Sequence, residues 1–417
     1  SLRRAATMPD WTAWPFPPED PYPSYHAARA NAPVQFNDAL DCYLVLSYEH
    51  AVTVLRGPEW SSDPRNNPAL LAALGGPGPV SQLWSRSVLM SDPPTHTRLR
   101  TAVNRFFTPR AVEAIRARVA AIVDAAFGPL IEGESVEVME ELAYPIPLAV
   151  IAELFDVGIE GADLLRTETP TMARMLELDA TPTTLEAASA AAMTLMLFLV
   201  PIVADRRRNP GSDLLSALVQ PQDGAVSLET DEIITMCLLL LAAGHETTAN
   251  LIGNGTLALL GHRDQLTWLH THPERARQAV AELLRYDSPV QLASRIARSD
   301  LSLGNVHVRK GQPALIALGA ANRDPHRYTN PDTLDLARPG PPHLAFGNGP
   351  HYCVGAGLAR LEAEQVFKRL ARAAMTWNTD SYSSERDRSR TFRRLRSLHI
   401  STRPAGNEQS LDAIAAS

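Results

Sequence analysis

The residues with the clearest chemical potential lie in Phe346-Gly347-Asn348-Gly349-Pro350-His351-Tyr352-Cys353-Val354-Gly355, a glycine-rich turn that presents one cysteine. Gly347 and Gly349 carry no Cβ, so the backbone there can adopt positive φ and fold closely around a neighbour. Such a turn can direct amide N–H groups at a sulfur, and the helical pattern that follows adds the positive end of a helix dipole. A thiolate stabilised in this way is a strong metal ligand. The alternative is that Cys353 is a small buried hydrophobic residue in a glycine-rich loop.

A second group of polar residues lies inside an apolar helical pattern that runs from Thr230 to about Leu260. At about 1.5 Å per residue, a helix of this length can cross a domain. Its centre reads Ala243-Gly244-His245-Glu246-Thr247-Thr248. Gly244 weakens a helix, and Glu246 beside Thr247 in an apolar stretch requires a partner or a function. The alternative is a helix kink in which Thr247 is hydrogen-bonded to its own backbone.

A pair of basic residues follows a proline stop at Asp92-Pro93-Pro94. His96 and Arg100 are four residues apart, so they share one face of the helix that this stop predicts. Two donors on one face suit an anion. The alternative is that the pair belongs to an ordinary solvated helix face.

The loop and the long helix resemble two motifs of the cytochrome P450 family. The loop fills every fixed position of the family's heme-binding signature, with Cys353 in the place of the axial ligand to heme iron. The helix centre is similar to the family's (Ala/Gly)-Gly-x-(Asp/Glu)-Thr motif, in which small residues leave room for dioxygen and the acid and alcohol deliver protons. The resemblance implies heme b as the cofactor, Cys353 as the metal ligand, and Glu246 and Thr247 as catalytic residues. His245 occupies a variable position of the motif and is not expected to bind a metal.

The resemblance also implies which residues surround the cofactor. Basic residues of three distant segments are expected to neutralise the heme propionates. Glu282 and Arg285 match the family's Glu-x-x-Arg, whose later partner would be Arg338, and the three are expected to brace the thiolate side of the core. The implied cofactor-binding residues are Cys353, His96, Arg100, Arg295, His351, Phe346, Gly347, Gly349, Ala243 and Gly244.

The substrate pocket has the weakest sequence signal. An irregular segment from Pro64 to Pro79 is followed by scattered apolar residues, and in the family this region helps to roof the pocket. A surface loop with a few core anchors is the alternative for this segment. The expected lining consists of Leu83, Trp84, Val88, Leu89, Leu239, Val290 and Leu292.

The pattern of the whole chain, together with the resemblance, predicts a mainly α fold with small β-sheets and a long central helix over heme. No linker, repeat or low-complexity run divides the 417 residues, so we expect a single domain over 1–417 with a loose tail from about 405 to 417. Seven prolines between 9 and 35 suggest an extended surface strap. Residues 183–207 read as a helix.

Composition narrows the function classes and the compartment. A net charge of −7 does not indicate a nucleic-acid-binding protein, which would typically carry an excess of basic residues. Three cysteines cannot form a disulfide framework, so a reducing cytoplasm is expected. All but two of the 39 basic residues are arginine, which points to a bacterial, actinobacterial type of source.

An uncharged run covers residues 187–204 and is just long enough to span a bilayer. We do not expect a membrane span, because a crossing there would separate Arg100 from Cys353, and both are expected to contact one cofactor. The run is instead interpreted as an unusually apolar helix that touches lipid or lines an apolar entrance.

The resemblance implies a heme-thiolate monooxygenase that inserts one oxygen atom of dioxygen into a lipophilic small molecule. No flavin, nicotinamide or iron–sulfur pattern is present in the sequence, so electrons are expected from a separate ferredoxin and its reductase, with Arg360, Lys368 and Arg369 as candidate docking residues. Azole compounds are expected to bind the heme. The alternatives are a non-catalytic heme protein that senses or carries a gas, a peroxide-driven heme-thiolate enzyme, and a heme-free helical binding protein.

Overall fold

Helices dominate the computed structural model, which describes residues 11–68, 82, 84–131, 135–220, 227–375 and 377–402. The mainly α fold with small sheets that the sequence predicts is confirmed. The predicted tail at 405–417 lies outside the described residues. In chain order the helices are α1 (Tyr22–Asn31), α2 (Tyr48–Arg56), α5 (Thr95–Asn104), α6 (Pro109–Ala114), α7 (Arg116–Phe127), α8 (Pro145–Phe155), α9 (Gly158–Ala173), α10 (Pro182–Arg208), α11 (Leu214–Val219), α12 (Thr230–Gly261), α13 (Arg263–Thr271), α14 (Ala276–Tyr286), α15 (Leu318–Ala321) and α16 (Ala356–Ala373).

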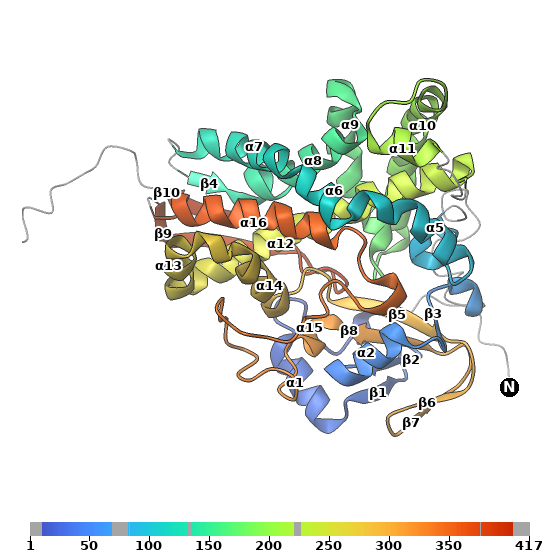
Figure 1. Cartoon of the computed structure of the whole chain (residues 1–417). Helices are drawn as coiled ribbons and strands as arrows, with labels where there is room; N and C mark the ends of the chain where they lie inside the picture. The colour runs from blue at the N-terminus through green and yellow to red at the C-terminus, as the bar shows by residue number, and fades with distance from the viewer. Residues whose placement is uncertain are drawn as a thin grey trace, which may run out of the picture.

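Helix α12 forms the centre of the molecule, with α16 passing in front of it in Figure 1. A reciprocal capping box between Glu229 and Glu232 starts the helix, and Arg98 of α5 is paired with Glu232. Its residues are apolar nearly all round, and a helix of this kind is stable only inside a protein. It packs on α8, α9, α10, α14 and α16, so side chains on α12 can reach the interior from several directions.

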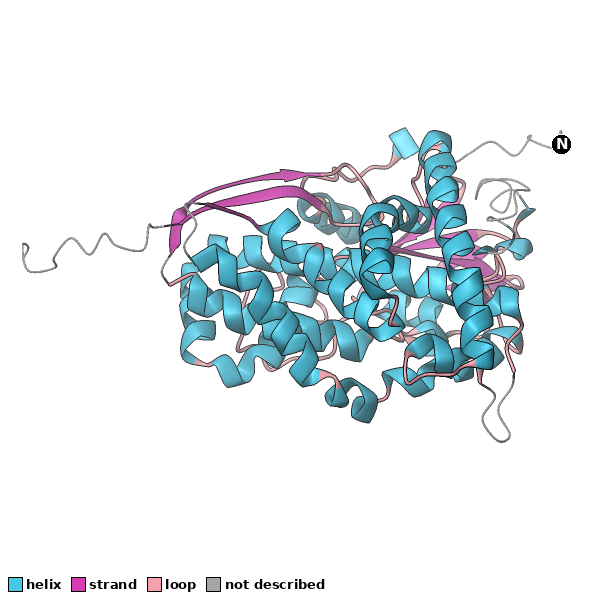
Figure 2. Cartoon of the chain, turned by 90° about the horizontal axis from the view of Figure 1, so that it is seen from above, coloured by secondary structure: helices cyan, strands magenta, loops and turns pink. Residues whose placement is uncertain are grey.

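The larger sheet lies below the helices in Figure 1 and has the strand order β1-β2-β8-β5-β3. Strand β2 runs parallel to β8, and the other neighbours are antiparallel. Sheet β4-β10-β9 lies along the opposite edge of the molecule in Figure 2. The bounds are β1 (Val34–Asn37), β2 (Cys42–Val45), β3 (Trp60–Ser61), β4 (Ser135–Glu137), β5 (Leu292–Ala297), β6 (Leu301–Leu303), β7 (Val306–Val308), β8 (Pro313–Ala317), β9 (Trp377–Arg386) and β10 (Leu395–Thr402).

The proline-rich segment near the N-terminus is not extended throughout. Ten of its residues form α1, with Pro21 at the N-cap and Pro23 in the first turn. Proline is tolerated there because the first N–H groups of a helix have no intrahelical partner. The extended conformation predicted from proline content is therefore wrong between Pro23 and Asn31.

Helix α10 is long and apolar enough to cross a membrane by length and composition. One of its faces is packed inside the protein, however. Ala188, Ala192, Leu195 and Leu199 belong to the same apolar cluster as residues of α9 and α12. This packing is that of a helix at the edge of a folded core.

Candidate functional site

The Cys353 loop has the backbone geometry that its glycines predict. Gly347 and Gly349 adopt φ values of +71° and +72°. A Cβ on Gly349 would lie 2.6 Å from the carbonyl oxygen of Leu55, so any side chain there would collide with α2. The turn closes with the Cys353 amide donating to the carbonyl oxygen of Phe346 at 2.9 Å.

Cys353 keeps solvent-accessible surface, unlike Cys42 and Cys237, although it lies deep among protein atoms. Burial raises the pKa of the thiol, and the amide N–H of Gly355, the guanidinium groups of Arg100 and Arg360, and the amide N–H of Ala356 counteract this effect. A metal ion would supply the additional positive charge that makes such a thiol ionise.

Four basic side chains converge near this loop from three separate segments. His96 and Arg100 come from α5, Arg295 from β5, and His351 from the loop, where its ring centroid lies 4.1 Å from that of His96. Burial and then the neighbouring Arg295, His96 and Arg100 lower the pKa of His351 to about 2. The structure therefore brings together the four residues that the sequence assigns to the propionates.

None of the four basic side chains forms an ion pair in the described part of the chain, although the charge of Asp92 acts on His96 and Arg295. Burial lowers the pKa of His96 and His351, so Arg100 and Arg295 carry the positive charge, and His96 Nε2 is buried without a hydrogen-bond partner. Burial lowers the pKa of Arg295 to about 10, and its NH1 group donates to the carbonyl oxygen of Ser294. Buried charge is costly unless it is paired, so the cluster fits an anionic group such as the two propionates of heme.

One face of α12 is less deeply buried than the rest of the helix. Leu240, Ala243, Gly244 and Thr247 are only partly buried, whereas most of their neighbours on this helix are fully buried. Their spacing of three and four residues places them on one face. The Thr247 hydroxyl donates to the carbonyl oxygen of Ala243 at 2.7 Å, which was the alternative interpretation of this residue.

Gly244 also has a packing role. A Cβ at this position would lie 2.8 Å from Cδ1 of Ile151 on α8. The glycine thus allows α8 and α12 to approach each other closely. This role does not depend on a ligand.

Glu246 is turned toward Arg394 and forms no hydrogen bond with Thr247. Its Oε1 accepts from Arg394 Nε at 2.5 Å and from Asn250 Nδ2 at 3.1 Å. The same guanidinium group also donates to Glu177 at 2.7 Å and to Asp387 at 2.9 Å. Sequence reasoning missed Arg394 and Glu177, because Arg394 is 148 residues from Glu246 in the chain and Glu177 has no local motif.

His245 packs against an aromatic ring. It is fully buried against the ring of Tyr144, with a centroid distance of 5.6 Å, and both ring nitrogens lack partners among the described residues. No group of three or more His, Cys, Asp and Glu side chains suited to a metal occurs in the described chain. A single thiolate such as that of Cys353 therefore fits a metal whose remaining ligands come from a cofactor.

The predicted bracing cluster is formed in the structure. Arg285 donates to both carboxylate oxygens of Glu282, at 2.7 and 2.8 Å, and Arg338 Nε donates to Glu282 at 3.0 Å. On the thiolate side, Arg360 lies over the ring of Phe346 at 4.6 Å and donates to the hydroxyl of Tyr352. These contacts of Arg360 stabilise the Cys353 loop.

The residues predicted to line the substrate pocket are divided between separate regions. Trp84, Val88 and Leu239 share one apolar cluster. Leu292 packs instead with Trp14 and other N-terminal residues, and Val290 packs at the larger sheet. Leu89 is 39% exposed, and Leu83 lies outside the described residues. Three of the seven residues thus belong to one large apolar cluster of the structure.

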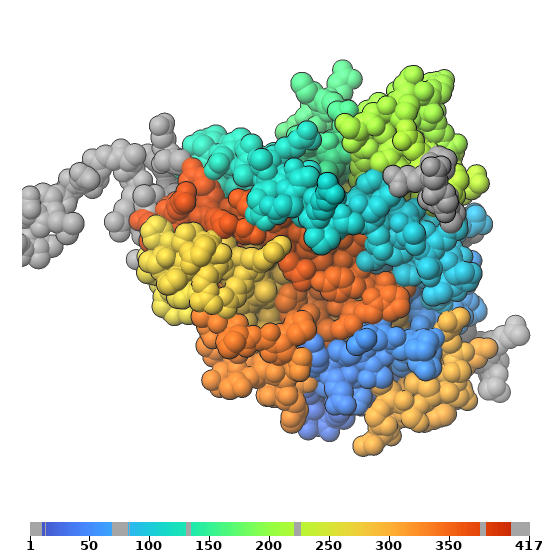
Figure 3. Space-filling model, viewed as in Figure 1, coloured from blue at the N-terminus to red at the C-terminus, as the bar shows by residue number. Residues whose placement is uncertain are grey.

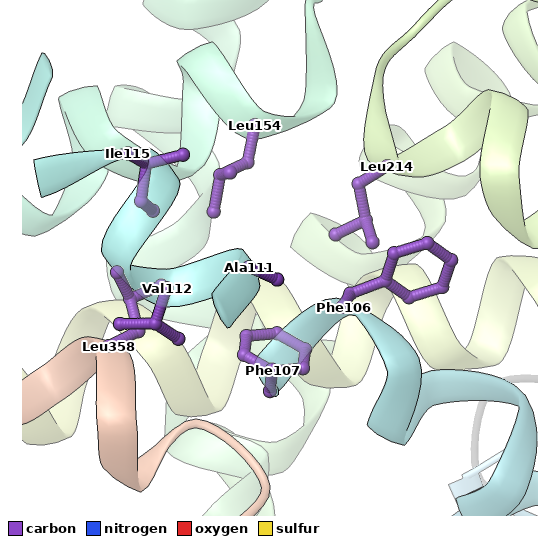
Figure 4. A pocket seen from close by; sticks show the side chains of 8 residues that line it. All are labelled: Phe106, Phe107, Ala111, Val112, Ile115, Leu154, Leu214 and Leu358. Carbon is purple, nitrogen blue, oxygen red and sulfur yellow. The ribbon is translucent and has the colours of Figure 1, made fainter. Parts of the chain in front are cut away.

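A different apolar pocket lies between α6, α8, α11 and the start of α16 (Figure 4). Its lining contains no charged or hydrogen-bonding side chain and none of the predicted site residues. It is therefore distinct from the site around Cys353. The lining consists of Phe106, Phe107, Ala111, Val112, Ile115, Leu154, Leu214 and Leu358.

Comparison with known proteins gives a consistent result. The family model described as "Cytochrome P450" matches residues 274–381. The chain is 38% identical to cytochrome P450 107B1 of Saccharopolyspora erythraea over 80% of its own length and 82% of that protein. It is 37% identical to 6-deoxyerythronolide B hydroxylase of the same organism, over 84% and 88%. The solved structure of P450BioI with an acyl carrier protein ligated to hexadec-9Z-enoic acid superimposes with a TM-score of 0.86 at 30% identity, covering 93% of this chain and 98% of that one.

Proposed function

The chain belongs to the cytochrome P450 family of bacterial monooxygenases, and from this premise we propose that it uses heme b to insert one oxygen atom of dioxygen into a lipophilic small molecule. The observation that carries the proposal is the Cys353 thiol. Of the three cysteines Cys353 alone is exposed, and four basic groups that form no ion pair among the described residues lie near its loop. Cys42 and Cys237 are buried.

The residues present fit heme b. Cys353 would bind the iron, and His96, Arg100, Arg295 and His351 would pair with the propionates. When bound, the heme supplies the activation of dioxygen. The protein contributes the thiolate, the cationic anchor and the partly accessible face of α12 with Ala243 and Thr247.

Glu246 and Thr247 are proposed to handle protons with distinct tasks. The Thr247 proton is bound to the Ala243 carbonyl, so its oxygen is free to accept a hydrogen bond from a water or a bound group. Arg394 binds the carboxylate of Glu246. In this position the carboxylate forms no hydrogen bond with Ala243 or Thr247. Proton transfer from Glu246 therefore requires a change in its pairing with Arg394.

A lipophilic substrate is supported by the shared cluster of Trp84, Val88 and Leu239. The printed descriptions of two similar proteins offer starting points for the substrate class. One is named as a hydroxylase of 6-deoxyerythronolide B, and the structure of another includes hexadec-9Z-enoic acid on an acyl carrier protein. Lipophilic macrolactones and long-chain acyl compounds are the first substrates to screen.

Electrons are proposed to come from a ferredoxin and its reductase. Of the three predicted docking residues, Lys368 is paired with Glu364, Arg369 with Asp124, and Arg360 supports Phe346. Arg110 on α6 is exposed and has no ion pair in the described structure. Helix α6 packs on Leu358 of α16, and Leu358 is only five residues from Cys353 in the sequence. Arg110 is therefore a better placed contact for an acidic ferredoxin than the three predicted residues.

A spectrum of the reduced protein with carbon monoxide tests the proposal. The red-shifted Soret band typical of a thiolate ligand is expected, and Cys353→Ser should abolish it. Cys42→Ala is the matched control, because Cys42 is buried in another cluster, and it should keep the band. A protein that lacks the band, or keeps it in Cys353→Ser, would overturn the assignment of heme and ligand.

Turnover separates the monooxygenase from its alternatives. With ferredoxin, reductase, NADPH and a substrate found by its spin-state shift, product should form in proportion to NADPH. A gas sensor should form no product, and a peroxide-driven enzyme should work with hydrogen peroxide alone. Azole compounds are expected to shift the Soret band of the ferric protein.

A further inference from the structure

One face of α10 points away from the molecule and has an unusual composition. Its seven residues follow each other at intervals of three or four, and all seven are exposed. Glu186 and Arg208 are the first and last of them, and the five between are uncharged. We call this set the α10 outer face: Glu186, Ala190, Thr194, Leu197, Pro201, Ala204 and Arg208.

The outer face carries apolar surface that the fold leaves uncovered. Leu197 is 65% exposed, and Val200 beside it is 44% exposed. Ile159 on α9 is 85% exposed and lies next to the second half of α10, where Arg206 donates to Asp156. Large apolar side chains exposed together mark interaction sites more often than ordinary surface. In Figure 3 the elements around α10 form a ridge at the top of the molecule, where a partner could approach.

The two ends of this face carry opposite charges, and neither charge is paired with another described residue. No ion pair or hydrogen bond joins the side chain of Glu186 or Arg208 to another described residue. Leu197 lies midway between them, because 197 − 186 and 208 − 197 both equal 11. At 1.5 Å per residue, each charge lies about 16 Å from Leu197 along the helix axis.

From this arrangement we propose that two copies of the chain form a dimer through their α10 outer faces, packed antiparallel about a two-fold axis at Leu197. In that arrangement Glu186 of each copy meets Arg208 of the partner subunit, and the two Leu197 side chains contact each other on the axis. The same surface patch serves both copies, as two-fold symmetry requires. Ala190, Thr194 and Ala204 are small enough to let the helices approach to the usual 8–10 Å.

The charges near the face favour a protein copy over an anionic lipid surface. Anionic headgroups would repel Glu186 at one end of the face and attract exposed Arg207 and Arg208 at the other end, so a lipid surface suits only one of the two ends. In the antiparallel dimer, by contrast, Glu186 acquires a cationic partner.

Analytical ultracentrifugation of the purified heme protein, from about 1 to 200 µM, tests the proposal. The wild type should sediment as a concentration-dependent dimer. Leu197→Asp places two carboxylates together on the axis and should raise the dissociation constant by at least about tenfold. Met375→Asp alters an equally apolar side chain, 40% exposed at the end of α16, and should leave the constant unchanged.

Charge reversal tests the antiparallel register. Glu186→Arg alone and Arg208→Glu alone should each weaken the dimer, because each places like charges opposite one another. The double variant should restore association to within about threefold of the wild type. Circular dichroism checks that every variant is folded.

Three outcomes would overturn the proposal. The wild type could remain monomeric at all concentrations, or the double variant could fail to restore the affinity lost in the singles. Alternatively, monomeric protein could bind phosphatidylglycerol vesicles in a way that Leu197→Asp abolishes, in which case the face contacts lipid. None of these outcomes bears on the spectrum that tests the heme thiolate.

Discussion

Arg394 is bonded to three carboxylates, those of Glu246, Glu177 and Asp387. Its side chain is nearly fully buried, as are those of Glu246 and Glu177. Removing one member of a buried ion pair leaves the others uncompensated, which typically costs about 3–5 kcal/mol. The consequences of this contact therefore extend to both stability and proton transfer.

Arg394→Met is expected to lower the free energy of unfolding by about 3–5 kcal/mol. It should also change the fraction of NADPH that ends as peroxide, because Glu246 loses its partner. Urea unfolding and peroxide assay with ferredoxin and reductase measure the two effects. Arg396→Met is the control, since Arg396 forms an exposed pair with Glu385 worth at most about 1 kcal/mol. Equal effects of the two variants would contradict the role of Arg394.

Glu362 and Glu364, two residues apart on α16, should affect the pH dependence of stability in opposite directions. Burial raises the pKa of Glu362 to about 8. Burial also acts to raise the pKa of Glu364, but Lys368 and Arg116 lower it below its usual value. Ionised Glu362 is therefore unfavourable in the folded state, and the free energy of unfolding should fall as pH rises from about 4.3 toward 8.

Glu362→Gln removes the ionisation and should raise the melting temperature more at pH 8 than at pH 5. Glu364→Gln removes a favourable pairing and should lower the melting temperature at pH 7, with the difference shrinking as pH falls below about 4. Thermal unfolding followed by circular dichroism from about pH 2 to pH 8 measures both. A Glu362→Gln profile parallel to that of the wild type would contradict the assigned shift.

At this scale the sequence predicted local geometry well and distant partners poorly. The positive φ of Gly347 and Gly349 follows from residue type, and the His96–Arg100 face follows from helical spacing. Arg394 is 148 residues from Glu246, and nothing nearby in the sequence distinguishes it from Arg393 or Arg396. Leu292 was placed at the pocket because of its neighbours in the chain, although alternate residues of a strand face opposite sides.

At the scale of elements, the crossing of α8 and α12 is set by Gly244 and Ile151. Alanine at 244 would gain about 1 kcal/mol of helix propensity, and the contact of its Cβ with Ile151 Cδ1 would cost about 1–3 kcal/mol. The net effect of Gly244→Ala is expected to be a loss of stability. The long helix α12 could be predicted from the sequence, because its acidic first turn runs directly into a continuous apolar series. The close approach of α8 to α12 could not be predicted.

A double-mutant cycle tests this crossing. Ile151→Val removes Cδ1, so Gly244→Ala in the Val background should stabilise the protein by about 1 kcal/mol instead of destabilising it. Urea unfolding of the four proteins measures the change of sign. The same sign in both backgrounds would show that the contact does not control the substitution.

At the scale of the whole molecule, Asp287 joins segments that are far apart in the sequence. It accepts from Tyr22 of α1 at 2.7 Å, from Arg393 at 3.0 Å and from Arg386 at 3.1 Å. Burial acts to raise the pKa of Asp287, but Arg393 and Arg386 lower it to about 2. The stability from this carboxylate is present above about pH 4 and should be lost as pH falls toward 2.

Asp287→Asn is expected to lower the free energy of unfolding by about 2–3 kcal/mol at pH 7, with little difference from the wild type near pH 2. It should also speed proteolysis of the segment before α1, because the strap loses its anchor. Asp300→Asn is the control, since Asp300 accepts a single hydrogen bond from the described residues, from the exposed backbone amide of Lys310. If the chain is a single domain, as we propose, fluorescence and circular dichroism should report one coincident transition.

The pairing of Glu246 with Arg394 has a consequence for protein synthesis. A ribosome adds roughly 5–20 residues per second, so the 148 residues between them take about 7–30 s to make. During that time the central helix exists with a carboxyl group that has no arginine to bind. A nascent chain should therefore keep this helix loosely packed, with Glu246 in contact with water, until the segment that carries Arg394 has emerged.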